Sequence, residues 1–182
     1  MKLYNMVNDA DFFALGPDRA PEQVVYCEAA QIEYEMSEEQ ETGKVAVSVQ
    51  LDGRAFYEHF AIDLMGNRFV GTGGDQVVAK MVRNIWKGPR LVRIGRTYCP
   101  KIVFSNSGLP AGSKFNRSLV MAYCKEPYTR FAERHPNVNF QAFVDDTYIG
   151  FFATKSHIVR TVTDAVNDYG RVLKEEMGID IA

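Results

Sequence analysis

Residues 138–153 read VNFQAFVDDTYIGFFA, and this stretch decides the fold. Its first half alternates like a half-buried strand, with one apolar face made of Val138, Phe140, Ala142 and Val144. The run TYIGFFA (147–153) then predicts a second strand that returns beside the first. We therefore expect Asp145 and Asp146 at the tip of a β-hairpin, where aspartate is also an ordinary turn residue.

The flanking segments predict the rest of the sheet. The stretch KVAVSVQLD (44–52) alternates as well, and Asp52 ends this strand on the face opposite its apolar row. A helix over 156–177 and a short strand over 179–182 follow the hairpin. The order β, α, β, β, α, β predicts an α+β, ferredoxin-like (βαββαβ) fold with a helical insert. In that topology the first strand neighbours the hairpin, so Asp52, Asp145 and Asp146 should converge.

The insert and the helices carry further apolar patterns. We expect helices over 54–65, over 76–87 with Asp75 as N-cap, and from about 114, and short strands near 90–95 and 101–105. Their apolar rows predict a set of buried residues: Phe56, Phe60, Leu64, Val77, Val78, Met81, Val82, Ile85, Trp86, Phe115, Leu119, Ala122 and Tyr123. The helix over 156–177 should bury Val159, Val162, Val166, Tyr169, Leu173 and Met177.

Composition points to an ordinary globular chain. It has 182 residues, of which 46% are hydrophobic and 24% charged, and no apolar run long enough to span a membrane. The first residues have one lysine and no uninterrupted apolar core, so we expect no secretory signal, and three cysteines without CxxC spacing indicate neither a disulfide framework nor a zinc finger. We expect a reduced, intracellular protein, nuclear or cytoplasmic, that is not secreted and binds no membrane.

Charge is divided unevenly along the chain. Residues 1–75 hold 14 acids and 5 bases, whereas residues 76–125 hold ten bases and no acid. Such a segment can attract phosphate even in a chain whose net charge is −2. It can equally be a solvated basic face that the acidic N-terminal third neutralises.

Three converging carboxylates repel one another unless a cation neutralises them. Hard carboxylate oxygens suit Mg²⁺, and two such ions about 3.5–4 Å apart stabilise the attacking and leaving oxygens of a phosphoryl transfer. An acidic cluster beside a basic segment suits this chemistry. If it is used, the carboxyl groups of Asp52 and Asp145 should lie within about 6–7 Å on one solvent-facing surface.

A family resemblance supports that interpretation. FVDDTYIG (143–150) resembles the [FY]-x-D-D signature of reverse transcriptases, and LDGRAFYEH (51–59) resembles their first palm motif. SGLPAGS (107–113) resembles the second palm motif, and LKEEMGIDIA (173–182) the helix and strand of the fourth. IWKGPRLVRIG (85–95) resembles the helix-and-strand connection of non-LTR (LINE-like) retrotransposon polymerases. The motifs occur in order over about residues 44–182.

The resemblance implies an RNA-directed DNA polymerase palm, a nucleotidyltransferase that uses an RNA template, a DNA primer and dNTPs. Asp52, Asp145 and Asp146 would bind two Mg²⁺ ions, with Mn²⁺ as a substitute. Tyr57 would lie under the sugar of the nucleotide and exclude a 2′-hydroxyl, although core packing is its alternative role. The nucleotide and template would lie beside a loop made of Gly108, Leu109, Pro110, Gly112 and Ser113. Nucleic acid would contact the bases Lys87, Arg90, Arg93 and Arg96.

The chain also departs from the family. Ala111 stands where the second motif usually has glutamine, and the chain ends before the lysine expected after the fourth-motif strand. We expect residues 1–43 to be an N-terminal segment, a remnant of fingers, and 44–182 to be a palm truncated before the thumb, part of a larger polyprotein or a decayed element. Two functions stay open: a polymerase palm, and a non-catalytic reverse-transcriptase-like domain that binds nucleic acid or has a structural role.

Overall fold

The structure is a computed structural model that describes residues 42–110, 113, 115–143 and 145–181, with Tyr26, Ala29, Ala30, 32–34, Met36 and Ser37. The described residues between 26 and 37 are all helical. Most of the predicted N-terminal segment 1–43 lies outside the described residues, as do Gly112, Val144 and Ala182.

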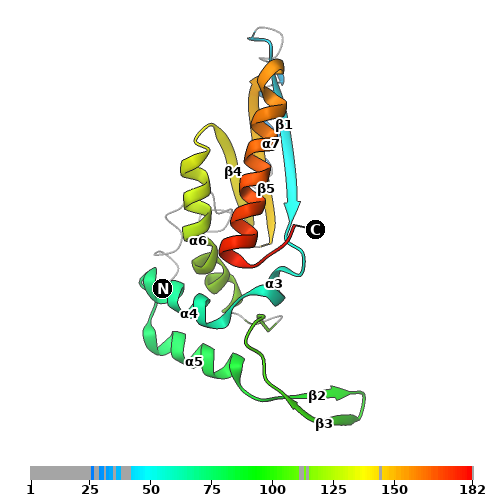
Figure 1. The fold of residues 1–182 in the computed structure, drawn as a ribbon, viewed down its shortest axis with the longest axis vertical. Coiled ribbons are helices and arrows are strands. Elements are labelled where there is room, and N and C mark those ends of the chain that lie inside the picture. Colours follow the sequence, from blue (N-terminus) through cyan, green and yellow to red (C-terminus); the bar gives the residue numbers. More distant parts are fainter. Residues whose placement is uncertain are drawn as a thin grey trace.

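A three-stranded antiparallel sheet forms the centre of the fold (Figure 1). It consists of β1 (Lys44–Asp52), β4 (Val138–Phe143) and β5 (Asp146–Thr154), in the order β1-β5-β4. The prediction that the first strand lies beside the hairpin is therefore confirmed. The predicted alternation also holds, since the valines of β1 and Leu51 pack against the core while Ser48, Gln50 and Asp52 are exposed.

Two long helices cover one face of this sheet (Figure 1). They are α6 (Asn116–Arg134) and α7 (Lys155–Val172), and α7 continues into the π-helical turn η1 (Leu173–Met177). Aromatic rings in edge-to-face and tilted contacts join the sheet to both helices: Phe140 of β4 contacts Phe131 of α6 and Tyr169 of α7, with ring centroids 4.8 and 5.7 Å apart. Such pairs add to the stabilisation that burial alone provides.

The helix predicted over 54–65 is wrong, because the chain forms two helices there. These are α3 (Phe56–His59) and α4 (Ile62–Gly71), separated by Phe60 and Ala61 in extended conformation. The Phe60 carbonyl accepts a hydrogen bond from the amide of Gly108 (2.9 Å), and Ala61 forms a β-bridge with Ser107. Hydrogen bonds to a distant loop thus replace those of a continuous helix, and Leu64 is exposed rather than buried.

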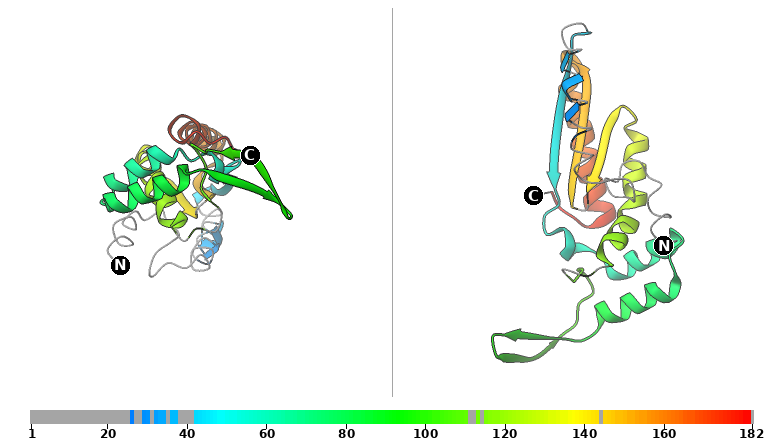
Figure 2. Two further views of the ribbon diagram at one scale, coloured as in Figure 1. Left: turned by 90° about the horizontal axis from the view of Figure 1, so that it is seen from below. Right: turned by 180° about the vertical axis from the view of Figure 1, so that it is seen from behind.

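The insert continues with α5 (Gln76–Lys87) and a separate hairpin of β2 (Arg90–Ile94) and β3 (Thr97–Val103). The predicted cap is confirmed, since Asp75 accepts hydrogen bonds from the amides of Val77 and Val78. The predicted apolar row is only half right: Val82 and Trp86 are buried against the core, whereas Val77, Met81 and Ile85 are exposed. Figure 2 shows the hairpin projecting away from the helices as a thin arm.

The predicted C-terminal strand over 179–182 is also wrong. In the described part of the chain this segment forms a single antiparallel bridge, between Gly53 and Ile181. The bridge lies just beyond the end of β1, at the place where a ferredoxin-like sheet has its fourth strand. Phe115 and Val159, predicted to be buried, are exposed at the ends of α6 and α7. No helix in the described ranges has the length and apolarity to cross a bilayer.

Asp168, a largely buried side chain of α7, joins α7 to the C-terminal end of α6. Its carboxylate accepts hydrogen bonds from Arg134 Nε (2.9 Å), His135 Nε2 (3.0 Å) and Arg171. Burial raises the pKa of Asp168, but the hydrogen bonds from Arg134, Arg171 and His135 outweigh it and lower the pKa. The charged form therefore stabilises the fold at neutral pH, and this stabilisation is lost as the pH falls below about 4.

Replacing Asp168 should destabilise the protein. We expect Asp168→Asn to lower the free energy of unfolding at pH 7 by about 1–3 kcal/mol, because charged hydrogen bonds of this kind contribute that much. Urea unfolding followed by circular dichroism measures the effect. The matched control is Asp164→Asn, which removes an exposed pair with Arg160 and should cost less than about 0.5 kcal/mol. Equal costs for the two variants would contradict this role of Asp168.

Candidate functional site

The three predicted acids lie together where β1 ends and β5 begins. Asp52 is the last residue of β1 and the direct antiparallel partner of Asp146, the first residue of β5. Direct partners project from the same face of a sheet, with Cβ atoms about 5 Å apart. Asp145 precedes Asp146 in the turn of the hairpin. The structure thus brings together acids that are more than 90 positions apart in the sequence.

Their surroundings are open and negatively charged. Asp52 and Asp146 are exposed and Asp145 is half-buried. The pKa of Asp146 is raised, first by partial burial and then by the charges of Asp145 and Asp52. The three carboxylates therefore interact electrostatically, and their negative charge is not compensated within the cluster.

The donor set suits a divalent cation in its chemistry. Carboxylate oxygens are the ligands that Mg²⁺ prefers, and a cation would relieve the repulsion that raises the pKa of Asp146. Among the residues that the structure describes, however, no three acidic, histidine or cysteine side chains gather closely enough to share one ion. The separation of the Asp52 and Asp145 carboxyl groups therefore stays a prediction.

Tyr57 lies beside the carboxylates. It is half-buried on α3, and its pKa is raised first by burial and then by the negative charges of Asp145 and Asp146. Its neighbour Phe56 anchors the short helix in the core. Between β1 and α3 the chain turns sharply at Ala55, whose left-handed backbone (φ 47°, ψ 44°) is unusual for a residue other than glycine. This turn directs Tyr57 towards the ends of β1 and β5.

The predicted loop of Gly108, Leu109, Pro110 and Ser113 runs along this same region. The amide of Leu109 donates a hydrogen bond to the Tyr57 carbonyl (2.9 Å), and the amide of Ser113 donates to Pro110 (3.3 Å). Gly108 has a φ of +88°, which explains why a residue without a Cβ stands there. The structure thus joins this loop to Tyr57, while Gly112 lies outside the described residues.

No sequence motif indicated two further contacts in this region. Asn116, the first residue of α6, donates a hydrogen bond from Nδ2 to the Pro110 carbonyl (2.7 Å) and fixes the loop. Behind Asp146, Thr147 Oγ1 is hydrogen-bonded to the Tyr169 hydroxyl (2.5 Å), which in turn donates to Tyr128 (3.2 Å). No sequence pattern indicated that Thr147 faces the core or that its hydrogen-bonded partners lie on α7 and α6.

The four predicted basic residues are not equivalent. Lys87 pairs with Asp63 of α4 (2.6 Å), and Arg90 donates a hydrogen bond to the Trp86 carbonyl (2.7 Å). Arg93 lies on β2 and Arg96 in the turn of the hairpin, where both are exposed. Figure 1 shows the hairpin at the end of the molecule towards which β1 points, beyond α3. The structure therefore divides the four bases into two with partners within the fold, Lys87 and Arg90, and two on the exposed hairpin, Arg93 and Arg96.

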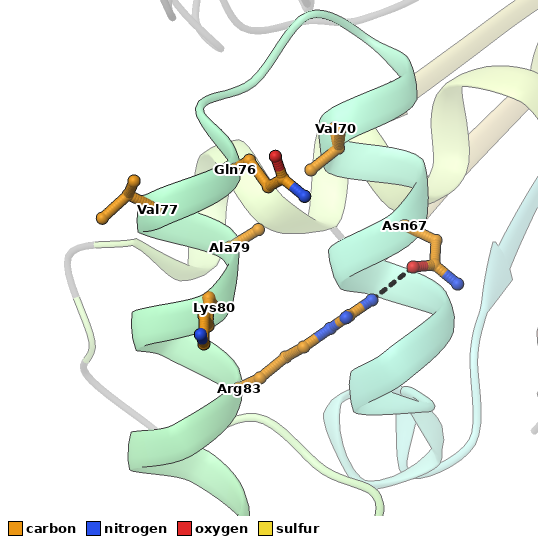
Figure 3. A pocket seen from close by; sticks show the side chains of 7 residues that line it. All are labelled: Asn67, Val70, Gln76, Val77, Ala79, Lys80 and Arg83. Atoms are coloured by element: carbon orange, nitrogen blue, oxygen red, sulfur yellow. Dashed lines mark hydrogen bonds between the residues drawn. The ribbon is translucent and has the colours of Figure 1, made fainter.

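A groove between α4 and α5 contains other polar groups (Figure 3). It has a volume of about 670 Å³ and is lined by Asn67, Val70, Gln76, Val77, Ala79, Lys80 and Arg83. Arg83 reaches across it and is hydrogen-bonded to Asn67 and to the Asp63 carbonyl. None of the predicted site residues lines this groove.

Known proteins identify the fold but not the family. No protein-family model and no curated protein sequence matches the chain. Solved structures that match include one described as apo telomerase from Candida tropicalis truncated from its C-terminal domain, with a TM-score of 0.67 and 10% sequence identity. The match covers 99% of this chain and 37% of the telomerase chain. The chain has a reverse-transcriptase-like fold. The predicted α+β class is thereby confirmed.

The electrostatics of the site predict a stability effect. The raised pKa of Asp146 means that its charged form destabilises the folded state, so stability falls as the pH rises through that pKa. We expect Asp146→Asn to raise Tm at pH 7 in the presence of EDTA, by no more than about 4 °C. Differential scanning calorimetry measures the shift. The control Asp164→Asn should not raise Tm, and a lower Tm for Asp146→Asn would show that the carboxylates do not repel one another.

Proposed function

We propose that the chain is the palm of an RNA-directed DNA polymerase, related to the non-LTR retrotransposon enzymes. The observation that carries the proposal is the direct pairing of Asp52 with Asp146, beside Asp145 and Tyr57. The likeness in fold to a telomerase supports the same class of chemistry. An intracellular location, nuclear or cytoplasmic, goes with this proposal.

In the proposed reaction, the 3′-hydroxyl of a DNA primer attacks the α-phosphorus of a dNTP. A new P–O bond forms, the bond to the β-phosphate breaks, pyrophosphate leaves, and the hydroxyl proton is released. Asp52, Asp145 and Asp146 would hold two Mg²⁺ ions, or Mn²⁺ in their place, and such ions supply charge stabilisation at the attacking and leaving oxygens. The carboxylates would fix the positions of these ions and therefore the positions at which charge on the reacting oxygens is stabilised.

The other residues have positioning roles in this proposal. Tyr57, half-buried beside the acids, forms the floor under the sugar of the nucleotide. The loop of Gly108, Leu109, Pro110, Gly112 and Ser113 shapes the backbone beside the nucleotide and the template. Because Leu109 is hydrogen-bonded to Tyr57, a shift of the loop would also shift the floor. The basic segment would contact the RNA template and the DNA primer, and further subdomains of a polyprotein would complete the enzyme.

One observation favours a second candidate, a non-catalytic reverse-transcriptase-like domain that binds nucleic acid or is structural. The described acids do not gather into a group that shares one ion. Such a domain would keep the fold and the basic arm but would not need a metal. The two candidates differ in one measurable property, the formation of product.

Primer extension tests the polymerase directly. With Mg²⁺, an RNA template and a DNA primer, the chain should extend the primer, and Asp145→Asn should reduce the rate about a hundredfold or more, because the charge that stabilises the transition state is lost. Asp164→Asn, an exposed acid of α7, should extend the primer as the wild type does. Absence of product, or equal product from Asp145→Asn, would favour the non-catalytic candidate.

A second experiment tests the role of Tyr57. If its ring blocks a 2′-hydroxyl, Tyr57→Val should increase the incorporation of ribonucleotides relative to deoxyribonucleotides by about ten- to a hundredfold, since one well-placed contact discriminates to that extent. Tyr57→Phe keeps the ring and should keep the selectivity. The ratio of kcat/KM for the two nucleotides is the measurement. An unchanged ratio in Tyr57→Val would leave Tyr57 with a packing role only.

A further inference from the structure

The hairpin of β2 and β3 is unusual because it lies apart from the core. Every residue from 91 to 104 is exposed, and the two strands pair only with each other. The turn holds Gly95 at a φ of +60°, the conformation that glycine supplies at the first position of a tight hairpin turn. A two-stranded hairpin is at best marginally stable in water. We therefore expect this arm to act together with a partner.

The exposed side chains of the arm are aromatic, aliphatic and basic. The register pairs Arg93 directly with Tyr98, so these two side chains share a face, while Leu91 and Ile102 form another direct pair on the far side of a shift in register. The Arg93 guanidinium lies 5.7 Å from the centroid of the Tyr98 ring, and its Nε donates a hydrogen bond to the Gly95 carbonyl (2.7 Å). Tyr98 is 58% exposed, so this cation–π pair is open to solvent. We call Arg93 and Tyr98 together the Arg93–Tyr98 face.

The charge of the arm selects the class of partner. The arm belongs to the segment 76–125, which has no acidic residue, and within the described part of the chain Arg93, Arg96 and Lys101 form no ion pair. Lys87 and Arg90, by contrast, are engaged by Asp63 and by the Trp86 carbonyl. The partner should therefore be negatively charged.

The chemistry of the face favours single-stranded nucleic acid. Unpaired bases stack on exposed aromatic rings and guanidinium planes, and neighbouring cations follow the phosphates. A duplex hides its bases from such a face, whereas exposed aliphatic side chains such as Leu91 and Ile102 suit the faces of unstacked bases. An acidic protein segment, including the acidic N-terminal third of a second copy of this chain, would use the charge but not the open stacking surface.

We propose that the Arg93–Tyr98 face binds single-stranded nucleic acid without sequence preference. This inference rests on the proposed function and deepens it, because it assigns the unpaired part of the template to this arm. It also revises the set of predicted basic residues, from which Lys87 and Arg90 are removed as direct contacts. The arm lies at the end of the molecule to which the carboxylate-bearing end of β1 points, so one strand can follow both (Figure 1).

Binding of a labelled oligouridylate of about 16 nucleotides to the full chain, followed by fluorescence anisotropy, tests the proposal. Tyr98→Ala should weaken binding about five- to a hundredfold, because a stacked base is lost, and Tyr98→Phe should bind as the wild type does. Arg93→Ala should weaken binding and lower the slope of log K against log salt by about 0.7. Arg160→Ala, an exposed arginine on α7, is the charge-matched control and should change nothing.

Three results would overturn the proposal. Wild-type affinity in both Tyr98→Ala and Arg93→Ala removes the face from binding. An equal loss in Arg160→Ala shows that only net charge matters. A chain that sediments as a dimer, becomes monomeric in Tyr98→Ala and keeps its affinity for the oligonucleotide has a protein interface on this face.

The same variants separate this proposal from the proposed function. Asp145→Asn should abolish primer extension and leave oligonucleotide binding unchanged. If the wild type binds through the arm but extends no primer, the polymerase fails and the arm stands. If it extends primers while the arm variants bind normally, the arm alone fails.

Discussion

The antiparallel pairing of β1 with β5 is the constraint on which the rest depends. Its nine residue pairs run from Lys44–Thr154 to Asp52–Asp146. Burial of the apolar row from Val45 to Leu51 against the hydrophobic core fixes the phase of β1, because a slip of one residue would expose that whole row. Once the phase is fixed, Asp52 and Asp146 must project from the face that the helices leave open. The position of the acids is thus a consequence of the hydrophobic core.

The buried side of the same strand pair is held by polar contacts. Thr147 lies between Asp146 and the core, and its hydrogen bond to Tyr169 continues to Tyr128. Burial raises the pKa of Tyr169 and of Tyr128 far above the usual range of a phenol, so both stay neutral and act as hydrogen-bonding groups. In a low dielectric a satisfied network of this kind specifies one arrangement of its members. The strand that carries the repelling acids is therefore fixed from behind by both long helices.

The sequence was most informative for features that follow from a local pattern or from the order of the elements. Alternation in β1 and β4 predicted the faces of both strands, and the order of elements predicted that Asp52 meets the hairpin. Periodicity could not predict the break at Phe60, because its cause is a hydrogen bond from Gly108, 48 positions later. It also could not predict that Val77, Met81 and Ile85 are exposed, since a stripe states which residues share a face and not whether anything covers it. Asn116 was missed because a single side chain bound to a loop carbonyl leaves no pattern.

The division of charge along the chain is another feature that the sequence predicts only in part, because it does not show which charges are paired in the fold. Along the sequence, residues 76–125 form one basic block that follows an acidic N-terminal third. In the fold, Asp63 of that acidic third pairs with Lys87, and it also lies 3.8 Å from Arg83, so part of the block is neutralised where α5 meets α4. Beyond Arg90, the described basic residues Arg93, Arg96 and Lys101 form no ion pair within the described part of the chain, and they lie on an arm that the core does not cover. Uncompensated negative charge is concentrated at Asp52, Asp145 and Asp146, on the uncovered face of the sheet. Uncompensated charge of each sign therefore lies on a surface that the hydrophobic core does not cover, and at both surfaces a charged ligand can supply the missing counter-charge.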